Sequence, residues 1–149
     1  MKSIALGVKE ASFGIKPLSL VKKTSKSGKK YEHKVSIRFI KKFEPLGWAI
    51  MKSPWIEFVD SKNKKKTCEF DLLMVHETTK QVCLIEIKSW EYVAGLRDIK
   101  YTYAPIVELM YPDYHFESII ANQKKGCGLN KILLDKSNPY GEVTLLKVR

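Results

Sequence analysis

Residues 68–90, CEFDLLMVHETTKQVCLIEIKSW, decide the fold of this chain. They contain two apolar runs, 70–75 and 82–87, joined by a polar connection. The length and composition of both runs are typical of buried β-strands. Each run nevertheless carries acidic residues, and a buried carboxylate without a partner is costly. The acids therefore indicate a binding or catalytic site rather than a purely structural pair of strands.

The two runs can be paired before any family is considered. In an antiparallel pair of strands, the residue numbers of directly opposed residues always add up to the same value. A tight turn centred on Thr78 and Thr79 therefore fixes the register. It pairs Val75 with Val82, Leu73 with Leu84, Asp71 with Glu86 and Glu69 with Lys88. Opposed Cβ atoms lie about 4.5–5.5 Å apart, close enough for two carboxylates to share a cation. The register predicts a bound metal, although a one-residue bulge would shift it.

The flanking sequence predicts a sheet covered on both faces. Away from the acids both faces of the two runs are apolar, as in central strands. Upstream, residues 31–43 have apolar side chains at helical spacing, and Pro45 with Gly47 ends that helix. Glu32 falls on its inward face and would reach toward the core. Alternatively, Glu32 only complements the positive end of the helix dipole.

The remaining chain predicts one α/β domain over residues 1–149. Residues 1–20 form a short strand or an arm, and residues 21–30 a basic loop, so that 1–30 make up a basic N-terminal arm. Strands are expected at 47–51, 55–59, 115–121, 132–134 and 143–148, a charged turn at 60–66, and a helix over 93–110 that Pro105 kinks. The core then spans 31–121, and 122–149 contribute closing strands.

The charge balance favours a polyanionic partner. The chain has 27 Lys and Arg residues against 16 Asp and Glu, a formal charge of +11. Nucleic acid is the leading candidate, because counterion release favours its binding to basic proteins. The candidate phosphate contacts are Lys22, Lys23, Lys26, Lys29, Lys30, Lys62, Lys64, Lys65 and Lys66. The alternatives are a solubilising lysine-rich surface and a solvated linker.

Cysteine usage and hydropathy indicate the compartment. The three cysteines form no CxxC pair, which argues against a disulfide framework and a structural zinc site. No apolar run approaches the length that spans a membrane. We expect a cytoplasmic protein, in the host cytoplasm if the source is a virus, with no membrane partner.

The predicted cluster supports hydrolysis of phosphodiesters. Mg²⁺ takes oxygen ligands and is typically held by one or two carboxylates plus substrate phosphate oxygens. Such a metal polarises the phosphate and lowers the pKa of bound water, while a nearby ammonium group stabilises developing charge. Asp71, Glu86 and Glu32 could supply the carboxylates, with Glu69 as a further possibility, and Lys88 the ammonium.

At these residues the sequence resembles the PD-(D/E)xK nuclease superfamily. Asp71 matches its first acid, Glu86-Ile87-Lys88 its E-x-K motif, and Glu32 the acid that many members carry upstream. Phe70 stands where the motif has Pro, and Glu69 could substitute for Glu32 or compete with it. A second likeness, to archaeal Holliday-junction resolvases, rests on Glu32 followed by residues 47–51, GWAIM.

The resemblance implies a fold and an activity. The fold is a restriction-endonuclease-like αβββαβ core with a central mixed sheet flanked by helices. The activity is that of a DNA endonuclease dependent on Mg²⁺, for which Mn²⁺ can substitute, and cleavage of both strands would require a homodimer. The alternatives are a non-catalytic nucleic-acid-binding module with this fold and a protein-interaction or assembly subunit that does not bind DNA appreciably. For Glu86 and Lys88, the alternative is an exposed strand end with an ion pair to Glu69.

Overall fold

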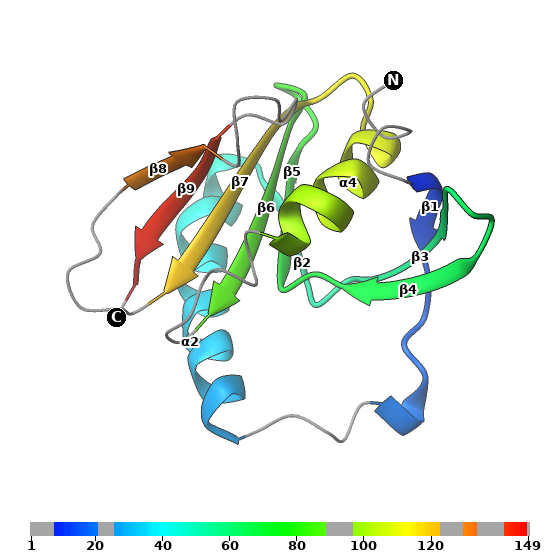
Figure 1. Cartoon of the computed structure of the whole chain (residues 1–149). Helices are drawn as coiled ribbons and strands as arrows, with labels where there is room; N and C mark the ends of the chain where they lie inside the picture. Colours follow the sequence, from blue (N-terminus) through cyan, green and yellow to red (C-terminus); the bar gives the residue numbers. More distant parts are fainter. Residues whose placement is uncertain (1–7, 21–25, 89–96, 123–129, 134–141, 149) are drawn as a thin grey trace.

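The computed structural model describes residues 8–20, 26–88, 97–122, 130–133 and 142–148. These residues form a mixed α/β fold in which a six-stranded sheet lies between helices, with a second, three-stranded sheet beside it (Figure 1). No helix in these ranges is long and apolar enough to cross a membrane.

The large sheet is mixed, and its strand order is β2-β5-β6-β7-β9-β8. Its strands are β2 (Ala49–Lys52), β5 (Leu72–His76), β6 (Gln81–Lys88), β7 (His115–Asn122), β8 (Asn130–Leu133) and β9 (Glu142–Lys147). The strands β2, β5 and β6 pair antiparallel, β6, β7 and β9 pair parallel, and β8 returns antiparallel beside β9. Because parallel neighbours need a crossover connection, the chain leaves the sheet after β6 and comes back at β7.

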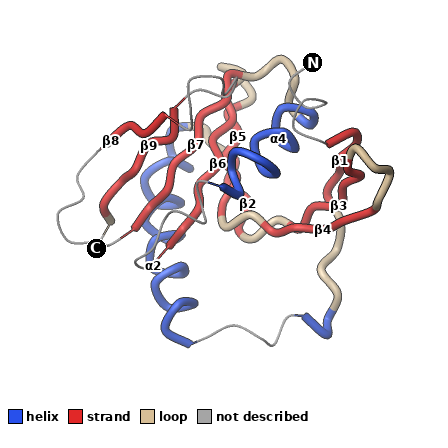
Figure 2. The backbone as a smooth tube through the Cα atoms, in the orientation of Figure 1, coloured by secondary structure: helices blue, strands red, loops and turns tan. Residues whose placement is uncertain are grey.

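Helices cover both faces of this sheet, as Figure 2 shows. Helix α2 (Lys26–Phe43) packs Val35 and Phe39 on one face, where Leu72, Met74, Cys83 and Ile85 form the core. Helix α4 (Ala104–Met110) packs Ile106 and Val107 on the other face, against Leu73, Val75, Val82 and Leu84. The prediction that β5 and β6 are central strands covered on both sides is confirmed.

The small sheet has the order β1-β3-β4 and extends the core on the α4 side. Its strands are β1 (Val8–Phe13), β3 (Trp55–Asp60) and β4 (Lys65–Glu69), all antiparallel. Val8, Ile56 and Phe58 point inward and join the α4 core, and β1 contacts α4. The chain therefore changes sheets three times, between β1 and β2, between β2 and β3, and between β4 and β5.

The last two changes of sheet, from β2 to β3 and from β4 to β5, occur side by side. Ser53 takes a left-handed conformation (φ 53°), and its N–H donates to the carbonyl of Asp71 at 2.9 Å. The N–H of Phe70 donates to the carbonyl of Pro54 at 3.1 Å. Sheet corners are commonly made by strands that bend in this way. This corner lies at the start of β5, where the predicted site begins.

Several predicted elements are confirmed and others are corrected. The strands expected around 47–51, 55–59, 115–121, 132–134 and 143–148 all exist within a few residues, and α2 ends at Phe43 before left-handed Gly47 (φ 97°). Residues 8–13 form β1 and α2 begins at Lys26, so these parts of 1–30 belong to the folded unit rather than to an arm. The strand β4 was not predicted. Pro105 lies at the start of α4, directly after a π-helical turn, Ile99–Tyr103.

Candidate metal centre

Asp71 and Glu86 lie against each other at the end of the β5–β6 hairpin. The strands pair as predicted, with Leu73 opposite Leu84 and Val75 opposite Val82. Asp71 occupies the bend just before β5, and its N–H donates to Glu86 Oε1 at 3.4 Å. The N–H of Ile87 donates to Asp71 Oδ2 at 2.6 Å. The predicted register is confirmed, and it brings the two carboxyl groups together.

Burial and mutual repulsion make this pair hard to ionise. Glu86 is only 2% exposed, and burial raises its pKa well above the usual range, with the charge of Asp71 adding to the effect and Lys88 opposing it. Burial also raises the pKa of Asp71, against the opposing effects of the Ile87 N–H and Lys88. Two crowded carboxyl groups of this kind favour either a shared proton or a bound cation.

The wall of the site on the α4 side is apolar. Phe70 is fully buried, and its ring lies 4.9 Å from the ring of Tyr103. Burial first, and then the charge of Glu86, raise the pKa of Cys68 to about 12. Burial and Glu86 likewise raise the pKa of the Tyr103 hydroxyl. Both groups therefore stay neutral, and the charges beside Glu86 come from Asp71 and Lys88.

Glu32 approaches the same corner from α2. It is half-buried, because Tyr31 and Val35 on either side of it belong to the core. Burial raises the pKa of Glu32, and the charges of Asp71 and Glu69 raise it further, while Lys52 and a hydrogen bond from Ser53 act in the opposite direction. Glu32 is thus within electrostatic range of Asp71, in keeping with an inward-facing acid.

The predicted pairing of Glu69 with Lys88 is wrong. Glu69 ends β4 and pairs with Trp55 of β3. Its carboxylate accepts an ion pair from Lys16, with Nζ 2.7 Å from Oε2. The reason is the corner at residues 70–71: the chain changes sheets there, so the pairing of β5 with β6 begins only at Leu72. Lys16 was missed, since residues 1–20 show no periodicity that would place it.

The donor set fits a small divalent cation. Among the described residues no three His, Cys, Asp or Glu side chains form a group that could hold a metal. Mg²⁺ needs fewer, because it keeps several waters and uses one or two carboxylates. Asp71 and Glu86 supply these carboxylates, and the crowding that raises both pKa values is relieved by a cation. The site therefore suits Mg²⁺ held by this pair, with Glu32 and Lys88 near it.

The candidate phosphate contacts fall into two groups. Lys29 and Lys30 are exposed on α2, where Lys26 is the first residue, whereas Lys22 and Lys23 lie outside the described residues. Lys62, Lys64, Lys65 and Lys66 are exposed at the β3–β4 hairpin. Asp60 shapes this turn by accepting from the N–H groups of Lys62 and Lys64. A strand rises about 3.3 Å per residue, so Lys65 at the start of β4 lies about 13 Å from Glu69 at its end. The lysines of the hairpin are therefore about this far from the corner that holds the acid pair.

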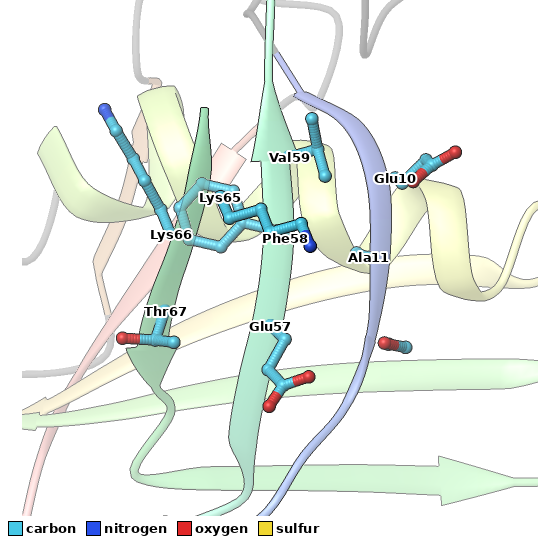
Figure 3. Close-up of a pocket in the computed structure, with 9 residues that line it drawn as sticks. Glu10, Ala11, Glu57, Phe58, Val59, Lys65, Lys66 and Thr67 are labelled. Carbon is cyan, nitrogen blue, oxygen red and sulfur yellow. The ribbon is translucent and has the colours of Figure 1, made fainter. Parts of the chain in front are cut away.

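A hollow of about 610 Å³ lies elsewhere, along the strands of the small sheet (Figure 3). Its lining includes exposed residues that are acidic, basic or polar: Glu10, Glu57, Lys65, Ser12 and Thr67. Asp71, Glu86 and Lys88 do not line it. The hollow is therefore separate from the acid pair.

Comparison with known proteins adds no family assignment. No family model matches the sequence, and no curated protein matches it. The interpretation of the site accordingly rests on its geometry, and the nuclease resemblance at Asp71, Glu86 and Lys88 stays a prediction.

The raised pKa values predict how stability depends on pH. The folded protein favours the protonated forms of Glu86 and Asp71, whose ordinary pKa values are 4.5 and 3.8. Their stabilising contribution is therefore present at low pH and is lost as pH rises through the raised values. In EDTA, we expect the free energy of unfolding to fall between about pH 5 and about pH 8 more steeply for the wild type than for Glu86→Gln. Urea titrations at both pH values measure this difference, and parallel pH dependences would contradict it.

Proposed function

We propose that this protein is a metal-dependent DNA endonuclease of the PD-(D/E)xK type, built on a restriction-endonuclease-like αβββαβ core. The observation that carries the proposal is the contact between half-buried Asp71 and buried Glu86, with Lys88 two residues further along β6. The order α2, β2, β5, β6, α4, β7 supports the core, with β3 and β4 of the small sheet as additional strands. The formal charge of +11 supports a nucleic acid substrate.

Each residue then has a role. Asp71 and Glu86 would hold Mg²⁺, which when bound supplies Lewis acidity toward the phosphodiester and lowers the pKa of a bound water. Lys88 would position that water and stabilise the negative charge that develops on the phosphate. Glu32 would add negative charge on the α2 side of the site.

A cleavage assay tests the proposal. Wild-type protein should nick supercoiled plasmid or cut a four-way junction in the presence of Mg²⁺, and EDTA should stop the reaction. Inactivity on duplex, single-stranded and branched DNA with both Mg²⁺ and Mn²⁺ would contradict it. DNA binding that is sensitive to salt but never leads to cleavage would instead support a non-catalytic nucleic-acid-binding module.

The lysines of the β3–β4 hairpin should contribute phosphate contacts. Replacing Lys64 and Lys65 by Ala is expected to weaken binding to all DNA sequences alike. Each phosphate contact contributes about 0.9 to the slope of log K against log salt, so the slope should fall by about two. Fluorescence anisotropy over a range of salt concentrations measures both effects.

The control for the hairpin variant has the same change in charge. Lys41 and Lys42 are exposed near the C-terminal end of α2, away from the hairpin. Their replacement by Ala removes two charges from the molecule but no hairpin contact. Equal loss of affinity and of salt slope in the two double variants would show that the hairpin makes no specific contribution.

A further inference from the structure

Residues 14–20, here called the strap, follow β1 and include two exposed apolar side chains, those of Ile15 and Leu18. Ile15 is 90% exposed, and Leu18 is almost equally so. The side chain of Lys16, by contrast, is only 30% exposed. It reaches Glu69 with Nζ 2.7 Å from Oε2, and Nζ lies 5.9 Å from the centroid of the Trp55 ring. The strap thus places a lysine, rather than an apolar residue, against the acidic corner.

The partner of Lys16 is the acid that competes with Glu32 for a role at the site. Glu69 lies two residues before Asp71, and its charge acts on both Asp71 and Glu32. A cation held by Asp71 and Glu86 would feel the same charge. With Lys16 in place this corner carries one negative charge fewer, and the Glu69 carboxylate has an ion-pair partner, although its buried Oε2 accepts no hydrogen bond from the described residues.

We propose that Lys16 is a positioning residue that withholds Glu69 from the metal, so that the cation is held by Asp71 and Glu86. This inference rests on the proposed function, because it assumes a cation at that pair. It assigns Glu69 a role in charge balance. On this inference Glu69 is not the third carboxylate ligand, because the Lys16 ammonium, 2.7 Å from Oε2, offsets the charge that would draw its carboxylate to the cation.

A double-mutant cycle separates charge balance from ligation. Lys16→Met leaves one uncompensated negative charge beside the site, so Mg²⁺ should bind about tenfold more tightly. Glu69→Gln leaves Lys16 uncompensated, so binding should weaken about tenfold. The double variant removes a neutral pair, and its affinity should return to that of the wild type. If Glu69 were a ligand, the double variant would bind as weakly as Glu69→Gln alone.

The experiment is a calorimetric titration of the full chain with Mg²⁺ in the absence of DNA. Lys41→Met is the control, because this exposed lysine lies near the other end of α2 from Glu32. Circular dichroism melts check that each protein is folded, and Lys16→Gln serves as a second variant if Lys16→Met is not.

The outcomes distinguish the inference from the function on which it rests. Wild-type affinity in the double variant supports the role of Lys16. A double variant that binds as weakly as Glu69→Gln overturns that role and leaves the proposed nuclease intact. Wild-type protein that binds neither Mg²⁺ nor Mn²⁺ saturably contradicts the proposed function and the inference together.

Discussion

Replacing Glu86 by Gln is expected to abolish Mg²⁺-dependent DNA cleavage, lowering the rate at least about 10³-fold. The amide keeps the shape of the side chain but removes the charge that holds a cation beside Asp71. Because Glu86 is buried and resists ionisation, the metal-free variant should unfold at the same or a higher urea concentration than the wild type. Single-turnover cleavage and urea titrations of the same preparations measure the two effects.

Two further variants make this result specific. Lys88→Met should lose cleavage to a similar degree while still binding Mg²⁺, because it removes a positive charge and leaves both carboxylates. Glu117→Gln should cleave like the wild type, since Glu117 is exposed and pairs with Cys83 near the opposite end of β6. A Glu86→Gln protein that cleaves at the wild-type rate with Mg²⁺ would refute the role of the acid pair.

Replacing Phe70 by Ala is expected to lower the free energy of unfolding by about 3–5 kcal/mol. Phe70 is fully buried where the chain changes sheets, and its ring packs on Tyr103. Truncation leaves a cavity between the corner and the π-helical turn that precedes α4. Such a loss is a large part of the stability of a domain of this size.

Urea unfolding measures this loss, and Phe13→Ala is the matched control. Phe13 is a phenylalanine at the end of β1 that is 45% exposed, so its truncation should cost less than about 1 kcal/mol. Equal costs at the two positions would mean that Phe70 does not anchor the corner.

The central hairpin was predictable because its two faces and its turn constrain one register. A slip of one residue would exchange the side chains that face α2, such as Leu72, with those that face α4, such as Leu73. The turn at Glu77–Lys80 is symmetric about Thr78 and Thr79, as expected. The contact between Asp71 and Glu86 follows from this register, so the sequence alone was sufficient to place the acid pair.

The surroundings of the pair were not predictable in the same way. The sequence of β4, KKTCE, is polar, and its extended conformation comes from pairing with β3 rather than from any periodicity of its own. The bend at residues 70–71 that separates Glu69 from Lys88 depends on hydrogen bonds to Ser53 and Pro54. Lys16 follows β1, which lies at the opposite edge of the small sheet from β4, the strand that ends at Glu69. Such contacts between distant segments leave no local signal.

The short turn at Glu77–Lys80 also bears on how the chain folds. Asp71 and Glu86 are only 15 residues apart, and hairpins of this kind close in about 1–10 μs. Glu32, in contrast, reaches the corner only when α2 has packed on the sheet. Closing the hairpin is enough to bring the two carboxylates together, so their repulsion opposes its closure whether or not α2 has packed.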